Sequence, residues 1–170
     1  MVKSKNRLFI NRICLMLSIV LAFSLVLSGC GETNDTKEKA GTKLSLEGAV
    51  GLPGDTVSIP ISLSDNCGIW GSQILISYDS SVFSFVSCVN GEVFEMCDSN
   101  TVEEGICIIT SQLGTEDTTA NGLIATVKLK IKDIADDGEY KITIDEKTNF
   151  SNIAGELQEV SFEGCTVTVK

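Results

Sequence analysis

The 170-residue sequence contains no histidine, only two prolines and a single tryptophan. The absence of histidine excludes Ser-His-Asp and Cys-His catalysis, histidine-ligated zinc and histidine-based pH switches. The sequence also has no Asp-x-Asp-x-Asp-Gly calcium loop and no Cys-x-x-Cys pair. Adjacent acids such as Glu103 and Glu104 point to opposite faces of a strand or into water, which does not suit glycoside hydrolysis. We therefore expect no catalytic residue, no cofactor and no metal site in this chain.

Arginine and the other positive charges are scarce in most of the chain. The first 29 residues hold four basic side chains and no acid: Lys3, Lys5, Arg7 and Arg12. From Cys30 onward there are 9 lysines and no arginine against 23 aspartates and glutamates, a net charge of −14. A surface of this sign repels nucleic acid and anionic lipid headgroups, so we expect neither as a binding partner.

The basic N-terminus is followed by an uncharged, apolar run of 15 residues, residues 13–27. This length is typical of the apolar part of a signal peptide and is short for a membrane-spanning helix. The run ends in Leu-Ser-Gly-Cys at residues 27–30, which resembles the lipobox of bacterial lipoproteins. The resemblance implies cleavage before Cys30 and a diacylglyceryl group on its thiol. A membrane helix that ends in an unrelated cysteine is the alternative.

This interpretation predicts three segments. Residues 1–29 form a lipoprotein signal peptide, and residues 30–43 form the lipidated cysteine with a polar, flexible linker. Residues 44–170 form one folded domain. Two acyl chains hold a protein on a bilayer almost permanently, so we expect an exported protein anchored to the outer side of the bacterial cell membrane.

Alternation of apolar and polar residues dominates the chain after the linker, which predicts β-strands. Val57, Ile59, Ile61 and Leu63 alternate with polar residues and form one face of a strand. Pro60 lacks the N–H needed for a ladder, so this strand is expected at a sheet edge or at a bulge. The strands expected are residues 44–48, 56–63, 71–78, 82–86, 106–111, 122–132, 140–144 and the C-terminal segment with Val167 and Val169.

Residues 122–132 show the pattern most clearly, with Leu123, Ala125 and Val127 expected inside and Ile124 and Thr126 outside. Turns rich in Gly, Asp and Asn separate the apolar runs, and no segment predicts a long helix. Short strands with polar turns between them are typical of an all-β sandwich.

Several segments resemble the cohesin domain of cellulosome scaffold proteins. The resemblance lies in residues 53–61 (PGDTVSIPI), 68–69 (GI), 76–83 (ISYDSSVF), 122–127 (GLIATV), 138–143 (GEYKIT) and 160–164 (VSFEG) leading to Val167. It extends over residues 44–170, almost the whole part after the linker.

The resemblance implies a nine-stranded jelly-roll sandwich that catalyses no reaction and binds dockerins, which are calcium-loaded helical modules of other proteins. A lipid-anchored cohesin would hold a dockerin-bearing protein at the cell surface and link it to polysaccharide degradation. Carbohydrate-binding modules have a related sandwich fold, so a polysaccharide is a second candidate partner. A structural or adhesive surface domain is a third alternative.

Cohesins bind through one sheet face, and alternation identifies the residues that would form it here. The candidate contacts are Gln73, Leu75 and Ser77 on one strand, and Ile109 and Ser111, with Cys107, on a second. Many cohesins carry an acid at the position of Gln73, so the glutamine departs from the family pattern.

Trp70 has two interpretations, as a packing residue at the rim and as a further partner contact. The sequence has one Trp and two Tyr residues, Trp70, Tyr78 and Tyr140. Few aromatic rings are therefore available to stack against sugars.

Besides Cys14 and Cys30 the sequence has five cysteines: Cys67, Cys88, Cys97, Cys107 and Cys165. Because five is an odd number, internal disulfides cannot pair all of them. Export permits disulfides. Cys88 and Cys97 flank an expected turn and form the one pair for which we predict a bridge. The alternative is that all five are free and act as small apolar residues.

Overall fold

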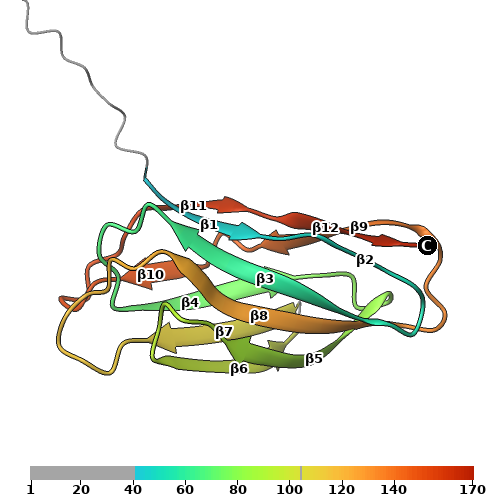
Figure 1. The fold of residues 1–170 in the computed structure, drawn as a ribbon, viewed down its shortest axis with the longest axis horizontal. Coiled ribbons are helices and arrows are strands. Elements are labelled where there is room, and N and C mark those ends of the chain that lie inside the picture. Colours follow the sequence, from blue (N-terminus) through green and yellow to red (C-terminus); the bar gives the residue numbers. More distant parts are fainter. Residues whose placement is uncertain (1–40, 104) are drawn as a thin grey trace, which may run out of the picture. The chain divides into compact units, whose positions relative to one another are not determined.

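The computed structural model describes residues 41–103 and 105–170, which form twelve strands and no helix (Figure 1). The predicted signal peptide, Cys30 and most of the predicted linker lie outside the described residues. The strands are β1 (Thr42–Leu46), β2 (Ala49–Gly51), β3 (Thr56–Ser64), β4 (Gly71–Ser77), β5 (Phe83–Asn90), β6 (Met96–Val102), β7 (Gly105–Ser111), β8 (Gly122–Ile131), β9 (Gly138–Ile144), β10 (Asn149–Ser151), β11 (Val160–Glu163) and β12 (Cys165–Val169). The first strand therefore begins two residues before residue 44, where the sequence placed the start of the domain.

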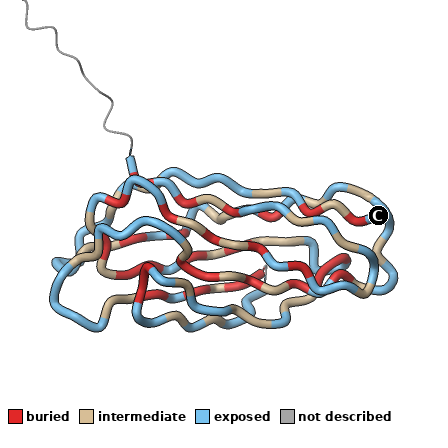
Figure 2. Tube along the Cα trace, viewed as in Figure 1, coloured by how far each residue is buried: buried red, intermediate tan, exposed pale blue. Residues whose placement is uncertain are grey.

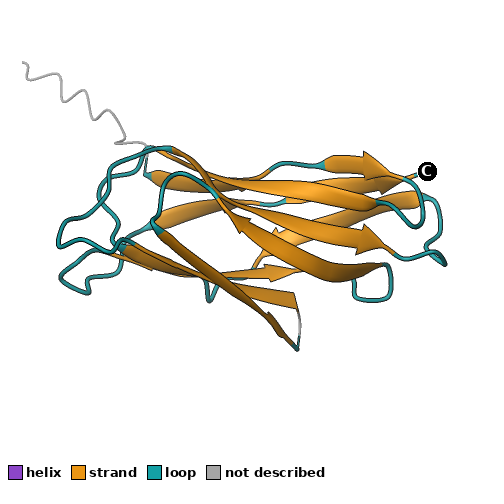
Figure 3. Cartoon of the chain, turned by 60° about the horizontal axis from the view of Figure 1, so that its bottom comes forward, coloured by secondary structure: helices purple, strands orange, loops and turns teal. Residues whose placement is uncertain are grey.

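The strands form two sheets that pack as a sandwich, with loops at both ends (Figure 3). One sheet has the order β11-β1-β3-β8-β5, and the other has the order β2-β12-β9-β4-β7-β6 with β10 paired to β4. The all-β prediction is confirmed. Three of the twelve strands have only 3 or 4 residues, β2, β10 and β11, so nine longer strands remain, the number that the resemblance implied.

The core lies between the sheets and consists of the inward side of each alternating strand (Figure 2). Val57, Ile59, Ile61 and Leu63 of β3 are all buried, as their spacing predicted. Burying an aliphatic side chain of this size contributes roughly 1.5–3 kcal/mol relative to leaving it in water. The alternation of the sequence thus places on one side of each strand the side chains whose burial drives folding.

A bulge explains why simple alternation fails in β8. β3 is paired on both sides, by β1 and β8, so Pro60 does not lie at a sheet edge. The pairing with β8 shifts just beyond it, because Ile61 pairs with Ala125 while the next residue pairs with Leu123. The extra residue, Ile124, is fully buried, although simple alternation placed it outside. A bulge changes which side a residue faces, and Pro60 was a correct signal for it.

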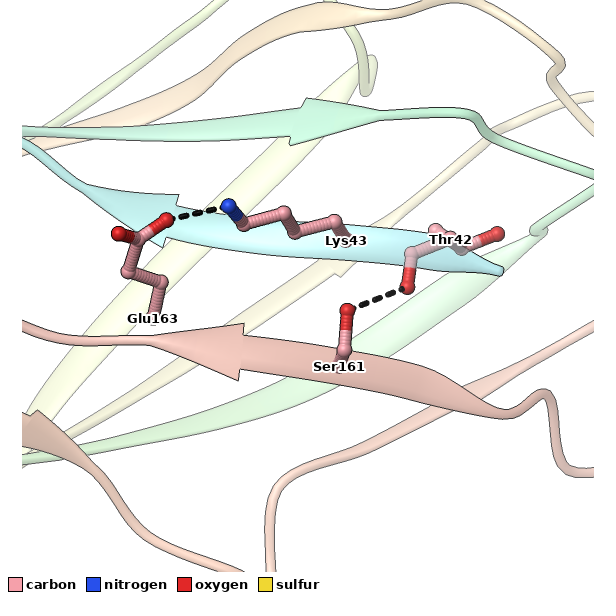
Figure 4. A network of polar contacts seen from close by, with 4 residues as sticks. All are labelled: Thr42, Lys43, Ser161 and Glu163. Carbon is pink, nitrogen blue, oxygen red and sulfur yellow. Dashed lines mark hydrogen bonds and ion pairs between the residues drawn. The ribbon is translucent and has the colours of Figure 1, made fainter. Parts of the chain in front are cut away.

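The ends of the domain are joined by parallel pairs, β1 with β11 and β2 with β12. At the first of these, Lys43 forms an ion pair with Glu163, and the hydroxyl of Ser161 donates to the carbonyl of Thr42 at 3.4 Å (Figure 4). Both charged side chains are about half exposed, so the ion pair itself contributes at most about 1 kcal/mol. Residues from both ends of the domain therefore share one sheet.

The motif Tyr-Asp-Ser-Ser-Val forms the tight turn that leads from β4 into β5. The carboxylate of Asp79 accepts hydrogen bonds from the backbone N–H and the hydroxyl of Ser81, at 2.8 and 2.6 Å. These two bonds hold the pKa of Asp79 below its usual value. The motif is thus a structural element of the fold.

Nothing in the described part of the chain is a helix long and apolar enough to cross a membrane.

Candidate docking surface

The exposed side of three neighbouring strands, β4, β7 and β6, forms the candidate docking surface, which we call the outer face. Alternate residues on these strands point away from the core. The outer face comprises Gln73, Leu75 and Ser77 of β4, Cys107, Ile109 and Ser111 of β7, and Met96, Asp98, Asn100 and Val102 of β6.

Strand pairing arranges these residues in rows across the sheet. Gln73 lies opposite Ile109, which in turn lies opposite Asp98. In the next row, Leu75 lies opposite Cys107. Directly opposite residues in antiparallel strands have Cβ atoms about 4.5–5.5 Å apart, and diagonal neighbours are about 7–8 Å apart. Leu75 and Ile109 are therefore diagonal neighbours around which polar groups are arranged.

Large apolar side chains on the outer face are open to solvent. Ile109 is 58% exposed, Met96 49% and Val102 45%, while Leu75 is half-buried and Gln73 is exposed. The orientation that alternation predicted for β4 and β7 is the one in the structure. Their role in binding a partner stays a prediction at this point.

The hairpin of β6 and β7 depends on a glycine. Gly105 begins β7 with a backbone φ of +153°, which side chains rarely allow, and it lies opposite Ser77 of β4. A Cβ atom at this position would lie 1.9 Å from the carbonyl oxygen of Ile76. The glycine lets β7 approach β4 closely, so that the side chains of both strands form one continuous surface.

The sequence did not predict β6 as a strand, so four residues of the outer face were missed. The segment MCDSNTV is mostly polar, because Cys97 and Ser99 are its small inward residues and Asp98 and Asn100 its outward ones. One sequence signal could have revealed β6. Two residues separate Val102 from Gly105, and loops of two residues are typical of β-hairpins.

A hollow of about 260 Å³ lies at one end of the outer face. Its apolar wall includes Leu75, Val102 and Ile106, and its rim carries both signs of charge, with Asp145 and Lys147. The turn before β10 is tied to β4 at Leu75, whose carbonyl accepts from the N–H of Asp145 and whose N–H donates to the hydroxyl of Thr148, both at 2.9 Å. Leu75 is half-buried beside it. The hollow is therefore a depression with an apolar wall and a charged rim.

Trp70 does not belong to the outer face. Its indole N–H donates to the carbonyl of Gly114 at 2.9 Å, and its backbone bonds to Ser151 and Gln112. The side chain is thereby held against the loop after β7. The packing interpretation of Trp70 agrees with the structure, and its role as a further partner contact stays a prediction.

The side chains of the two tyrosines make their contacts away from the outer face. Tyr140 donates its hydroxyl proton to the carbonyl of Asp136 at 2.9 Å, and its ring meets Phe83 edge-on at 5.8 Å. Tyr78 packs against the core. Among residues 41–103 and 105–170, no Trp or Tyr ring therefore lies on the outer face, where a sugar platform would need it.

The five cysteines of the described segments are all free. Cys107 lies on the outer face, and Cys67 is exposed in a loop. Burial raises the pKa of the Cys165 thiol to about 11. The sulfur atoms of Cys88 and Cys97 are 4.0 Å apart, so the predicted bridge is not formed although its two residues are neighbours. In the same residues, no group of three His, Cys, Asp or Glu side chains could hold a metal ion.

A family model described as "Cohesin domain" matches residues 42–165. The chain belongs to the cohesin family. The match covers all strands from β1 to the start of β12, so the family resemblance in the sequence is confirmed.

Individual relatives of this cohesin are distant in sequence. Cellulose-binding protein A of Clostridium cellulovorans is 24% identical over 123 residues, which cover 68% of this chain and only 6% of that protein. The cohesin CaCohA2 of Clostridium acetobutylicum is 22% identical with a TM-score of 0.68, over 76% of this chain and 91% of that one. A type I cohesin–dockerin complex from Clostridium thermocellum includes a chain that is 18% identical with a TM-score of 0.68, over 76% and 99%. These structures establish the jelly-roll sandwich of this cohesin.

Proposed function

We propose that this cohesin is a non-catalytic receptor that captures a dockerin-bearing protein on its outer face. The observation that carries the proposal is the set of apolar side chains turned to solvent on β4, β7 and β6. Ile109 occupies the centre, and Met96 and Val102 lie toward the two ends of the same hairpin. A solved complex between a related cohesin and a dockerin supports this choice of partner. The calcium of such a complex would belong to the dockerin.

The outer face has the composition of a protein interface. Ile109, Met96, Val102 and Leu75 would leave water on docking, and each fully buried aliphatic side chain supplies roughly 1.5–3 kcal/mol. This gain offsets much of the association cost, which is about 4–15 kcal/mol. Around them, polar groups such as Gln73 can fix the orientation of the partner through hydrogen bonds. An apolar centre with polar neighbours favours a protein partner.

The proposal includes a lipid tether at Cys30. The lipobox-like residues 27–30 support lipidation, and the polar residues that follow support a flexible connection to the domain. The eleven residues between Cys30 and β1 span roughly 40 Å when fully extended. The domain would then hold its partner close to the outer side of the membrane. If the partner is a polysaccharide-degrading enzyme or scaffold, capture keeps that activity at the cell.

Calorimetric titration of the purified chain with calcium-loaded dockerins tests the proposal. We expect a 1:1 complex that Ile109→Asp or Leu75→Asp abolishes, because each places a charge at the centre of the apolar patch. Thermal unfolding of Ile109→Asp should be almost unchanged, since the side chain is exposed.

The matched control is Val86→Asp, on the strand β5 of the other sheet, where the side chain is 51% exposed. This variant should bind dockerin like the unmodified chain. Failure to bind any dockerin encoded by the same genome would refute the receptor function, and equal loss in Ile109→Asp and Val86→Asp would refute the outer face as its site.

A further inference from the structure

Two half-buried thiols meet between the sheets of this cohesin. Cys88 lies on β5, at the edge of one sheet, and Cys97 lies on β6, at the edge of the other. Their Sγ atoms are 4.0 Å apart and share a hydrogen bond. We propose that Cys88 and Cys97 form a reversible, redox-controlled disulfide that joins the two edge strands across the sandwich.

Both side chains point into the space between the sheets. Cys88 pairs with Val127 of β8, and Cys97 pairs with Thr110 of β7; both of these partners are buried. The two cysteines pack against the core from opposite layers. A bond between them would be the one covalent link between the sheets other than the chain itself within the described strands.

The connection between the two strands holds the thiols together. In the loop from β5 to β6, the N–H groups of Gly91 and Glu92 donate to carbonyls of β8 at 2.7 and 2.8 Å. The side chain of Asn90 donates to the carbonyl of Phe94 at 3.1 Å, and Phe94 itself is buried. Because this loop is anchored to the body of the domain, the two sulfurs are positioned before any oxidation occurs. The approach still needed is about 2 Å, since a disulfide has an S–S length of about 2.05 Å.

The two thiols differ in acidity, which suits them for thiol–disulfide exchange. The hydrogen bond from Cys88 lowers the pKa of Cys97, and the same bond, with burial, raises the pKa of Cys88. The thiolate is the reactive form of cysteine, so Cys97 is the attacking group.

The oxidant that we propose is a small external disulfide, written RSSR. The sulfur of Cys97 attacks one sulfur of RSSR, forms a mixed disulfide and releases the first RSH, which takes the proton of Cys97. The sulfur of Cys88 then attacks the sulfur of Cys97, and the second RSH leaves with the proton of Cys88. The protein loses two electrons and two protons, and one RSSR gains them.

The Cys88–Cys97 disulfide would stabilise β6, the edge strand of the outer face. β6 is paired on one side only, by β7, and it carries Met96, Asp98 and Asn100 on its outward side. A disulfide to β5 gives this strand a second attachment and closes a short loop, which removes conformations from the unfolded chain. This inference depends on the position of the two thiols and does not rest on dockerin capture.

Peptide mapping of the full-length chain tests the bond directly. The chain is equilibrated with oxidised and reduced glutathione at several ratios, alkylated and digested with a Glu-specific protease. Cleavage at Glu92 and Glu95 separates the two cysteines unless a disulfide joins them. We expect the joined Cys88–Cys97 peptides to appear as the ratio of oxidised glutathione rises and to disappear with dithiothreitol.

Thermal unfolding gives an independent readout. Oxidation should raise the Tm by about 10 °C, and dithiothreitol should reverse the shift. Cys88→Ser should remove the shift, while Cys67→Ser, which changes an exposed thiol distant in sequence, should retain it. Glutathione adducts on Cys88 or Cys97 without joined peptides, or alkylation of both thiols at every ratio, would overturn the proposal. Mapping of the unmodified chain decides this even if a variant fails to fold.

Discussion

Gln73 is the residue with the clearest consequence for partner choice. It is exposed on the outer face between Asn149 of β10 and Ile109 of β7. An amide oxygen accepts a hydrogen bond without the added strength of a negative charge. If the outer face binds a dockerin as proposed, this glutamine would tune the affinity and selectivity of the docking, because the resemblance implies an acid at this position in many cohesins.

We therefore predict that Gln73→Glu raises the affinity for a dockerin that this cohesin binds, by about fivefold at low salt. A hydrogen bond to a charged group contributes about 1 kcal/mol more than a neutral one. Titration calorimetry at two salt concentrations measures the change, and the gain should shrink at high salt. Asn100→Asp, also on the outer face but in the next row, provides a control for added charge alone. An unchanged or weaker affinity of Gln73→Glu would show that this residue does not accept a bond from the partner.

At the scale of elements, the hairpin of β6 and β7 determines how much apolar surface the outer face offers. β4 alone contributes Leu75, whereas the hairpin adds Met96, Ile109 and Val102. The hairpin is held to β4 through the full length of β7, where Gly105 permits the close approach. The outer face therefore depends on the close backbone contact between Gly105 and Ile76 as well as on its exposed side chains.

We predict that Gly105→Ala lowers the free energy of unfolding by about 2 to 4 kcal/mol, because its Cβ would collide with the backbone of Ile76. Equilibrium unfolding in urea measures the loss. Gly114→Ala is the matched control, since an added Cβ there meets no atom within 4 Å. If Gly105→Ala were as stable as the control, the close approach of β7 to β4 would not be needed for the fold.

At the scale of the whole molecule, the acidic domain and the N-terminal segment carry different features. The domain carries the outer face, and residues 1–30 carry the features of an export and lipidation signal. A charge of −14 after residue 29 gives the domain no attraction for an anionic membrane, so attachment would depend on the lipid.

We predict that expression in a bacterial host with an alkyne-labelled fatty acid labels the chain and places it in the membrane fraction. Cys30→Ala should remove the label, because the thiol that accepts the lipid is lost, while Cys67→Ala should keep it. In-gel fluorescence after click labelling measures both. A label that persists in Cys30→Ala, or an unlabelled native chain, would contradict the lipid tether.

The sequence by itself determined the features that follow from local chain geometry. Side chains alternate between the two faces of any strand, so the inward residues of β3 and the outward orientation of Gln73, Leu75 and Ile109 could be predicted without a structure. The turns and the all-β class followed from the same pattern and from the cohesin-like motifs.

Only the tertiary structure decided the features that depend on which strands are neighbours. β6 is a strand because β7 pairs with it, and its own polar composition gives little indication of this. Ile124 is buried because a bulge shifts the pairing of β3 and β8, and Trp70 packs on a loop 44 residues away in sequence. Cys88 and Cys97 were paired across a turn from the sequence, but that they lie in opposite sheets that face each other is a feature of the tertiary structure. Pairing and packing between strands fix these four features, and local alternation carries no information about which strands become neighbours.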